Sequence, residues 1–236
     1  MAGLSMHPAP RRDPELTMTA PAQLKIDFVS DVSCPWCAIG LSALEQALRN
    51  VEGEVEAELR FQPFELNPQM PAGGQDITEH LTQKYGSTPQ QQADSREAIR
   101  QRGESLGFTF RKEGRGRVYN TFNAHRLLHW AELQGAAGQR ALKKALLGAY
   151  FTEGRSPEDH EVLLGAVAQA GLDVDQAREV LESDTYAAEV REREQFYLDN
   201  GIHAVPAVII NGRHLIQGGQ PVEVFEQALR RIATSA

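Results

Sequence analysis

The chain has 236 residues, of which 41% are hydrophobic and 24% charged, and its formal net charge is −8 at pH 7. These proportions are typical of a globular protein with a substantial core, and the acidic balance argues against a nucleic-acid or anionic-membrane partner. Two cysteines are too few for a disulfide framework. No segment is apolar for long enough to cross a membrane. We expect one large domain, or a domain that carries an insertion.

The first 22 residues contain four prolines and are interpreted as a disordered lead. They lack an apolar run of the length that a signal peptide needs. We therefore expect a cytoplasmic protein, in which a cysteine pair is more often reactive than structural. Met18 lies just before the first expected strand, so the sequence leaves open whether translation starts at Met1 or Met18.

A strand, a helix and a second strand follow the lead. Residues 24–30 alternate apolar and polar side chains, which is the period of a half-buried strand. Apolar residues then recur at helical spacing up to Asn50, and residues 55–62 alternate again. Connections of this length form a βαβ unit, so the two strands should run parallel.

The pattern changes at Pro63, where prolines and Gly73-Gly74 predict a turn-rich exit from the sheet. A mostly helical region follows, over about residues 76–183. Capping and proline signals open two of its helices, at Thr88-Pro89 and at a capping box over Ser156–Asp159. Helical spacing and terminal glycines predict the others, over about residues 120–134, 141–151, 173–181 and 184–200.

Strand periodicity returns after Pro206. Residues 207–210 and 213–216 flank Asn211-Gly212, a strong signal for a tight hairpin, and residues 222–232 form a closing amphipathic helix. The order is βαβ, a helical segment, then ββα. We predict an α/β, thioredoxin-like fold interrupted by an all-helical insertion domain. Its expected parts are the lead (1–22), the thioredoxin-like domain (23–72 and 184–236) and the insertion (73–183).

Both cysteines lie in Cys34-Pro35-Trp36-Cys37, at the first strand-to-helix junction. Pro35 suits the first helical position, which makes Cys34 the expected N-cap residue, with its sulfur facing the free amides of the first turn. Those donors and the helix dipole stabilise a thiolate. The motif therefore predicts dithiol–disulfide chemistry.

Two other interpretations of the cysteines are weaker. Buried, inert thiols do not fit a helix start with a proline at its first position. Half of a zinc site would need His125 and His129, from a distant helix, to complete it. We predict no metal site.

Five segments occur in the order found in a known family: SDVSCPWC, FQPFELNP, NTFNAHRL, YFTEG and VP, at residues 30–37, 61–68, 120–127, 150–154 and 205–206. Over about residues 24–233 the chain resembles the DsbA-like thioredoxin-fold oxidoreductases of the FrnE branch, whose helical domain is inserted in the thioredoxin fold. The resemblance implies disulfide exchange on protein thiols and disulfides.

The resemblance also assigns roles to residues. It implies that Cys34 is the nucleophile, that Cys37 resolves the mixed disulfide, and that a cis-proline at Pro206 faces the pair. The backbone of Val205 would then pair with an extended substrate segment. It implies no cofactor beyond the redox-active disulfide, with glutathione as a candidate redox partner.

Three departures from the family leave the direction of the chemistry open. The dipeptide between the cysteines is Pro35-Trp36 rather than the Pro-His of the oxidising periplasmic DsbA, the further cysteine pair of some FrnE-like relatives is absent, and no export signal is seen. The reduction potentials of protein disulfide oxidoreductases differ widely, and the two residues between the cysteines can contribute a large part of that difference. The sequence thus predicts an oxidoreductase or isomerase without choosing between them, and it leaves the oligomeric state open.

Two other classes of function remain as alternatives. One is a glutathione-dependent transferase or isomerase, like the kappa-class transferases and 2-hydroxychromene-2-carboxylate isomerases that share this split fold. Those relatives generally have a serine where this chain has Cys34, which argues against it. The other is a peptide-binding module without redox activity.

Further candidate site residues flank the motif. We expect the Trp36 ring to shield the disulfide and to contact substrate. Asp31 is a candidate proton acceptor, with turn formation as the alternative. Phe64 is a candidate groove residue, with core packing as the alternative, and His125 is a further groove candidate.

Two basic stretches are expected to be solvated surface. They are Lys143-Lys144 in an expected helix, and the arginines of residues 111–117. Gly114 and Gly116 make the second stretch an expected mobile loop, and it lacks the glycine–lysine pattern of a phosphate-binding loop.

Overall fold

The structure of the protein is a computed structural model that describes residues 20–235. The expected disordered lead therefore lies almost wholly outside the described residues, as do Met1 and Met18. The elements in chain order are β1 (Ala22–Ser30), α1 (Pro35–Asn50), β2 (Val55–Pro63), β3 (Gln75–Asp76), α2 (Ile77–Tyr85), α3 (Pro89–Ser105), β4 (Arg117–Val118), α4 (Phe122–Gln134), α5 (Ala136–Leu147), the π-helical turn η1 (Gly148–Thr152), α6 (His160–Gln169), α7 (Val174–Leu181), α8 (Ala187–Asp199), β5 (Ala207–Ile210), β6 (His214–Gln217) and α9 (Val222–Ala233).

The main sheet has four strands in the order β2-β1-β5-β6. β1 and β2 are parallel, with Ile26 opposite Leu59, as the βαβ pattern predicts. β5 is antiparallel to β1, with Ile26 opposite Ile210, and β6 closes the sheet as an antiparallel edge strand. The predicted α/β thioredoxin-like arrangement is confirmed. None of the helices among residues 20–235 combines the length and apolar character needed to span a bilayer.

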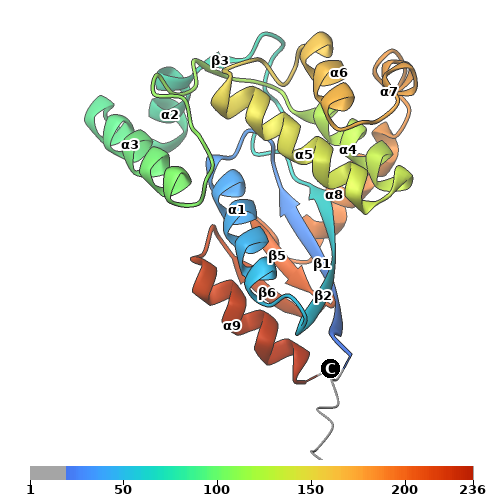
Figure 1. Cartoon of the computed structure of the whole chain (residues 1–236). Coiled ribbons are helices and arrows are strands. Elements are labelled where there is room, and N and C mark those ends of the chain that lie inside the picture. The colour runs from blue at the N-terminus through green and yellow to red at the C-terminus, as the bar shows by residue number, and fades with distance from the viewer. Residues whose placement is uncertain (1–19, 236) are drawn as a thin grey trace, which may run out of the picture.

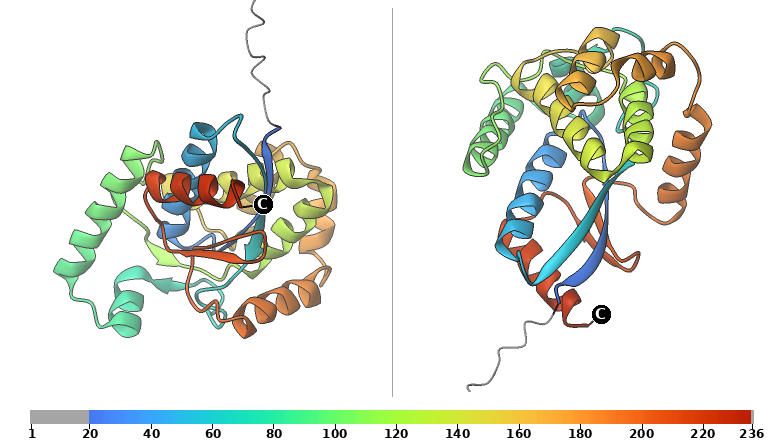
Figure 2. Two further views of the ribbon diagram at one scale, coloured as in Figure 1. Left: turned by 90° about the horizontal axis from the view of Figure 1, so that it is seen from below. Right: turned by 45° about the vertical axis from the view of Figure 1, so that its right-hand side comes forward.

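Alternation along β1 divides the core between two faces of the sheet. Phe28 packs in a cluster with residues of α1 and α9, which cover one face (Figures 1 and 2). Its neighbour Val29 points to the other face and packs with Tyr197 and Ile202 of the α8 region. This period-two switch is what the sequence of β1 requires, because successive side chains of a strand point to opposite faces.

The β5–β6 hairpin turns at Asn211-Gly212, where both residues have positive φ, 53° and 66°. This backbone suits the two-residue turn predicted from the sequence. The Asn211 side chain accepts a 2.9 Å hydrogen bond from the backbone N–H of Lys25, so the turn is also tied to β1.

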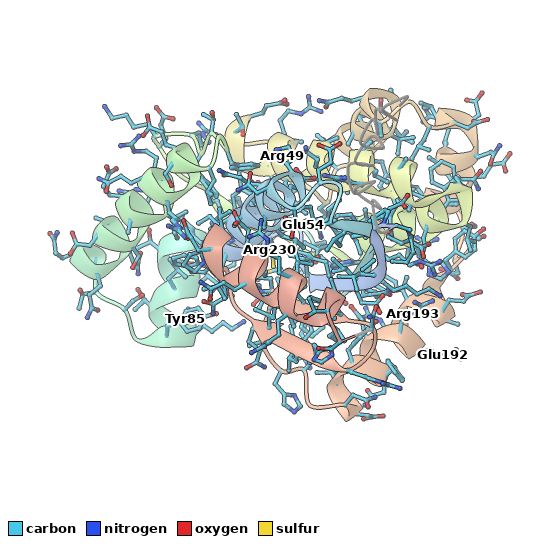
Figure 3. All side chains as sticks on the ribbon, turned by 60° about the horizontal axis from the view of Figure 1, so that its bottom comes forward. Arg49, Glu54, Tyr85, Glu192, Arg193 and Arg230 are labelled. Carbon is cyan, nitrogen blue, oxygen red and sulfur yellow. The ribbon has the colours of Figure 1, made fainter. Side chains whose placement is uncertain are left out.

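Helix α9 is held to the βαβ unit by charge as well as by packing. Arg230 Nε lies 3.0 Å from Glu54 Oε2 in the loop before β2, and Figure 3 shows the two side chains together beside α9. Both side chains are about half exposed, so the pair adds at most about 1 kcal/mol and mainly fixes geometry.

The segment between β2 and α8 lies across one end of the main sheet, above the start of α1 in the view of Figure 1. β1 and β2 both run toward it, because they are parallel and α1 begins where β1 ends. The carboxyl ends of these strands, the cysteine motif and the inserted helices therefore meet in one place.

Three details of the insertion differ from the prediction. It is not all-helical, because β3 pairs with β4 in an antiparallel two-stranded sheet. α5 begins at Ala136 rather than about residue 141, since Gly135 caps both the end of α4 and the start of α5. The Ser156–Asp159 segment is a turn rather than a helix start: Asp159 is itself the N-cap residue, accepting from Glu161 N–H at 2.9 Å.

Candidate active site

Cys34 is the N-cap residue of α1, with extended backbone (φ −91°, ψ 115°) and Pro35 at the first helical position. The predicted placement is thus confirmed, but the predicted orientation of the sulfur is only partly right. The thiol makes no capping hydrogen bond to the first turn. Instead, Cys34 Sγ donates to the carbonyl oxygen of Val205 at 3.7 Å. The sulfur therefore faces the loop on the opposite side of the site.

The pKa of Cys34 is lowered from its ordinary value. The main cause is Cys37, whose thiol donates to Cys34 Sγ and whose backbone N–H adds a second favourable interaction. Burial and the negative charge of Asp31 oppose this shift, whereas the positive charge of Arg115 supports it. Cys34 is consequently the sulfur of the pair that ionises first.

Cys37 is fully buried on the first turn of α1. Burial raises its pKa well above that of a free thiol, and its hydrogen bond to Cys34 raises it further. Both cysteines are free thiols in this structure. The two sulfurs thus differ in the direction that distinguishes an attacking thiol from a resolving one.

A cis peptide bond joins Val205 to Pro206, the geometry that the family resemblance implied for this pair. Pro206 is buried, and its ring lies against Gly40 of α1, where an added Cβ would be only 3.1 Å from Pro206 Cγ. Val205 is half-buried, and its carbonyl is the acceptor for Cys34 Sγ. The start of α1 and the proline loop are therefore opposite walls of one site.

Asp31 is fully buried in the turn between β1 and α1. Its carboxylate accepts hydrogen bonds from Ser33 N–H (3.1 Å), Ser33 Oγ (2.9 Å) and Leu66 N–H (2.8 Å), and it lies 3.5 Å from His125 Nε2. Although burial opposes ionisation, the His125 contact and these donors lower the pKa of Asp31 to about 2. Asp31 is thus a fixed anion that organises the turn before Cys34.

Arg115 is a site residue that the sequence assigned to solvated surface, and that prediction is wrong. Its guanidinium donates from Nη1 to the carbonyl oxygen of Ser33 at 2.9 Å and lies 5.8 Å from the centroid of the Phe151 ring. Arg117 of the same stretch donates to the carbonyl oxygens of Gly73 and Gly74. Because these contacts join segments far apart in the chain, local composition gave no signal for them.

Lys143 is a second correction, since its side chain is fully buried although the sequence assigned it to the surface. Only Lys144 is surface-exposed, and it pairs with Glu45 of α1 at 3.0 Å. The missed signal is position within the helix: Lys143 lies four residues after the buried Gln139 and four before the buried Leu147. That spacing places all three on one face of α5.

Trp36 and Phe64 occupy different environments. The Trp36 side chain is 44% exposed beside the cysteines, a placement compatible with substrate contact. Phe64 is buried in the cluster that contains Val29 and Ala207, and Val205 packs against that cluster. Phe64 therefore supports the proline loop from within the core instead of lining an open groove.

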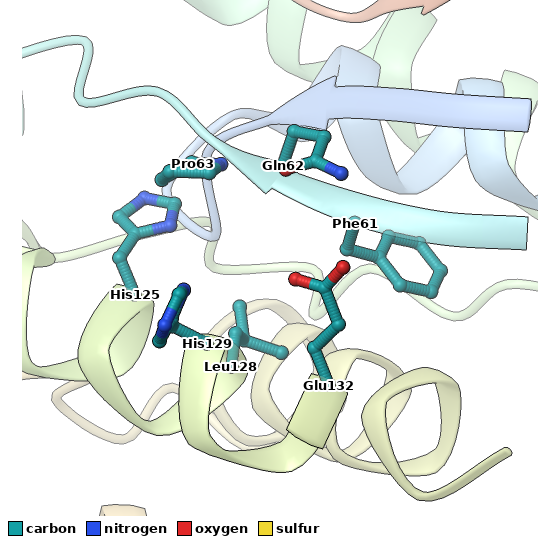
Figure 4. A pocket seen from close by; sticks show the side chains of 7 residues that line it. All are labelled: Phe61, Gln62, Pro63, His125, Leu128, His129 and Glu132. Atoms are coloured by element: carbon teal, nitrogen blue, oxygen red, sulfur yellow. The ribbon is translucent and has the colours of Figure 1, made fainter. Parts of the chain in front are cut away.

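His125 and His129 do not converge on the cysteines. His125 faces Asp31, whereas the His129 ring packs 5.1 Å from the Tyr186 ring. Both line a cavity of about 10 Å³ between α4 and β2 (Figure 4). That volume holds about one water molecule, so it is not a substrate pocket.

A comparison of the sequence with protein-family models shows which family the chain belongs to. Residues 25–230 match the model of the DsbA-like thioredoxin domain. The chain belongs to this family. The DsbA-like fold, together with the paired thiols at the start of α1, identifies the protein as a thiol–disulfide oxidoreductase in the general sense.

Solved structures agree with the family assignment. A probable DsbA oxidoreductase from Streptomyces coelicolor is 31% identical, with a TM-score of 0.82 over 90% of each chain. The cytosolic disulfide reductase DsbM from Pseudomonas aeruginosa is 20% identical, with a TM-score of 0.63, covering 90% of this chain and all of DsbM; it has also been solved with GSH. A 2-hydroxychromene-2-carboxylate isomerase is 16% identical, with a TM-score of 0.64 over 89% of this chain and 97% of its own. The last two likenesses concern the fold alone.

Proposed function

We propose that the protein catalyses thiol–disulfide exchange on protein disulfides, with Cys34 as the attacking thiolate and Cys37 as the resolving thiol. The observation that carries this proposal is the position of the two free thiols, at the start of α1 and facing the Val205–Pro206 loop. The lowered pKa of Cys34 and the raised pKa of buried Cys37 agree with it. Two thiols with separated pKa values suit a two-step exchange. The Cys34 sulfur attacks the substrate, while the Cys37 thiol stays protonated until the mixed disulfide is resolved.

In the reducing direction, the Cys34 thiolate attacks one sulfur of a substrate disulfide and forms a mixed disulfide, and the other substrate sulfur leaves as a thiolate. Cys37 then loses its proton and attacks Cys34 Sγ. The products are the Cys34–Cys37 disulfide and a second substrate thiol. If the first released thiolate attacks a different disulfide of the substrate before Cys37 acts, the outcome is isomerisation.

The substrate backbone is proposed to lie along the proline loop. Val205 directs its carbonyl oxygen toward Cys34 Sγ, 3.7 Å away, so an extended peptide paired with this residue would carry its own sulfur past Cys34. Exposed Trp36 supplies an apolar contact on the α1 side of the site. In this arrangement the protein contacts the substrate backbone more than its side chains.

We propose glutathione as the reductant that restores the dithiol, in a cytoplasmic setting. What supports this is a hollow of about 280 Å³ lined by residues 67–71, Gln75 and His80. Leu66, immediately before this lining segment, donates to Asp31, which also accepts from Ser33 N–H, so the hollow begins next to the turn before Cys34. The name and the GSH-bound structure of DsbM, a protein with the same fold, provide further support.

Insulin reduction and the refolding of scrambled ribonuclease test the proposal. We expect the wild type to accelerate both reactions and Cys34→Ser to lose both. Cys37→Ser retains the attacking thiol, so it should accumulate a mixed disulfide with substrate. Equal behaviour of the wild type and Cys34→Ser in both assays would refute the mechanism.

The same variants separate the two alternatives. Turnover of a small electrophile with glutathione that survives Cys37→Ser would instead support a glutathione-dependent transferase or isomerase. Peptide binding without exchange, combined with an iodoacetamide titration that gives Cys34 the pKa of a free thiol, would support a binding module.

A further inference from the structure

Lys143 lies on the face of α5 that packs against β2. One turn before it, the Gln139 side chain accepts from Phe61 N–H and donates to Phe61 O, both at 2.9 Å. One turn after it, Leu147 belongs to the apolar cluster that contains Cys34 and Cys37. Lys143 Nζ itself lies 6.0 Å from the centroid of the Phe61 ring. The amine therefore lies beside β2, and Cys37 is the group whose charge acts on it most strongly.

The Nζ atom of Lys143 is fully buried and has no hydrogen-bond partner among residues 20–235. It also forms no ion pair with a carboxylate of the described residues. An unpaired ammonium is strongly disfavoured in such a site, so the neutral amine is the form that fits. Burial accordingly lowers the pKa of Lys143. A neutral amine carries a lone pair and is a base.

The groups that act electrostatically on Lys143 are Cys37 first, then Asp31 and Cys34. Arg115 acts in turn on Cys34, and His125 acts on Asp31. The carboxylate of Asp31 is already engaged by Ser33 and Leu66 and has a pKa of about 2, which makes it a poor proton acceptor. Among the described residues that act on Cys37, Lys143 is the one with a free lone pair.

Cys37 needs such an acceptor because it is fully buried and must lose its proton to attack. We propose that Lys143 accepts the proton of Cys37 as Cys37 attacks the mixed disulfide. This inference rests on the proposed function, since it concerns the second step of that exchange. It assigns to α5 of the insertion a part in chemistry that the cysteine motif performs.

The step balances within the protein and its substrate. The Cys37 proton moves to Lys143 Nζ, and the sulfur electron pair forms the bond to Cys34 Sγ. The bond between Cys34 Sγ and the substrate sulfur breaks, and the substrate leaves as a thiolate. The ammonium then returns its proton to that thiolate, so a neutral amine and a substrate thiol remain. No further oxidant or reductant is required.

A single-turnover experiment with oxidised glutathione isolates this step. Reduced protein is mixed with oxidised glutathione, quenched with acid and analysed by mass spectrometry, so that formation and loss of the Cys34–glutathione adduct are timed separately. In Lys143→Met, we expect the adduct to form within about threefold of the wild-type rate and to resolve about 100-fold more slowly at neutral pH, the usual size of a general-base effect. The difference in resolution rate between Lys143→Met and the wild type should narrow as pH rises, because hydroxide then takes the proton of Cys37 in place of the amine.

Lys144→Met is the matched control, since Lys144 is next in sequence but exposed and paired with Glu45. It should leave both rates unchanged. A merely structural role for Lys143 would not alter the pH dependence of one step alone. Resolution by folded Lys143→Met within about threefold of wild type across the pH range would overturn the inference.

If Lys143→Met does not fold, a measurement on the wild type tests the inference instead. In a carbon-13 NMR titration of the lysine side chains, Lys143 should titrate below the exposed lysines and shift between the dithiol and disulfide forms. If Lys143 titrates at the same pH as the exposed lysines in both the dithiol and the disulfide form, the inference is refuted. If the wild type forms no adduct at all, the proposed function itself fails, whereas an adduct that forms and resolves independently of Lys143 refutes only this step.

Discussion

Arg115 Nη1 donates a 2.9 Å hydrogen bond to the carbonyl oxygen of Ser33, the residue immediately before Cys34. The arginine comes from the loop between α3 and β4, and the serine from the turn between β1 and α1. The contact thus fixes a cation from the insertion next to Cys34. Its positive charge lowers the pKa of Cys34.

Replacing this cation should make Cys34 less acidic. In Arg115→Met, the hydrogen bond to Ser33 and the favourable charge are both lost, so the pKa of Cys34 should rise and its alkylation by iodoacetamide should slow a few-fold below that pKa. Lys112→Met removes a charge from an exposed position in the same loop and should leave the rate unchanged. An unaltered pH profile for Arg115→Met would contradict the assigned contact.

The ionisation of Asp31 should make the free energy of unfolding depend on pH, and the direction of its pKa shift gives the sign of that dependence. Its pKa is lowered from 3.8 to about 2 in the folded protein, so the ionised form is favoured by folding. A shift of this size contributes about 2 kcal/mol of stability, which is present above the unfolded pKa and is lost as pH falls through about 2. We expect Asp31→Asn to lower the free energy of unfolding by about 2 kcal/mol at neutral pH and by much less at pH 2.

Asp31→Asn should also affect the cysteine, in the opposite sense to Arg115→Met. The negative charge of Asp31 raises the pKa of Cys34, so its removal should lower that pKa. Urea denaturation and iodoacetamide titration measure the two effects on one sample. Asp94→Asn, at an exposed position on α3, is the control for both. A destabilised Asp31→Asn protein with a raised Cys34 pKa would show that the electrostatic sign is wrong.

Gly40 sets the distance between α1 and the proline loop. A Cβ there would lie 3.1 Å from Pro206 Cγ and 3.3 Å from Gly219 Cα, closer than ordinary contact. Gly40→Ala should therefore move the loop away from the cysteines, cost about 1–3 kcal/mol, and reduce exchange activity.

Gly148→Ala is the matched control, because a Cβ at Gly148 meets no atom within 4 Å and the backbone is helical (φ −63°). It should stabilise the protein by about 0.5–1 kcal/mol without affecting exchange. Thermal denaturation and insulin reduction of both variants check this pair. Full activity in Gly40→Ala would mean that the loop position does not matter.

Gln139 satisfies the outer backbone groups of the edge strand β2. Because β2 has a partner only on its β1 side, Phe61 N–H and C=O pair with the Gln139 side chain instead. In Gln139→Leu these buried groups lose their partner, and we expect a loss of about 3 kcal/mol. Urea denaturation checks it, with Gln90→Leu on the exposed start of α3 as the control. A loss below about 1 kcal/mol would contradict this account.

The sequence predicted the sheet well because the relevant signals are local. Alternation along β1 and β2 and the Asn211-Gly212 turn specify strands and register within a few residues. The position of the cysteines followed from Pro35 at the first turn of α1. The two-residue strands β3 and β4, by contrast, are too short to show any period.

The charged surroundings of the cysteines were missed for a different reason. Arg115 and Lys143 have the side chains of solvated residues, and only tertiary contacts bring Arg115 to Ser33 and Lys143 to the Phe61 ring. Lysine is almost never fully buried, so composition argued for the surface. The one available signal was the spacing of four residues between Gln139 and Lys143, which puts both on the same face of α5. The lysine side chain nevertheless led to a prediction of surface exposure.

The pairing of β1 with β5 brings together Ile26 and Ile210, which are separated by most of the chain. During synthesis the chain is made from its N-terminus, so the cysteine motif emerges well before the strands that complete its sheet. Contacts this distant in sequence also form late, because closing such a loop costs conformational entropy. The Val205–Pro206 wall therefore reaches Cys34 only when the chain is nearly finished, and until then the two thiols of the nascent protein lack the loop that faces them in the folded structure.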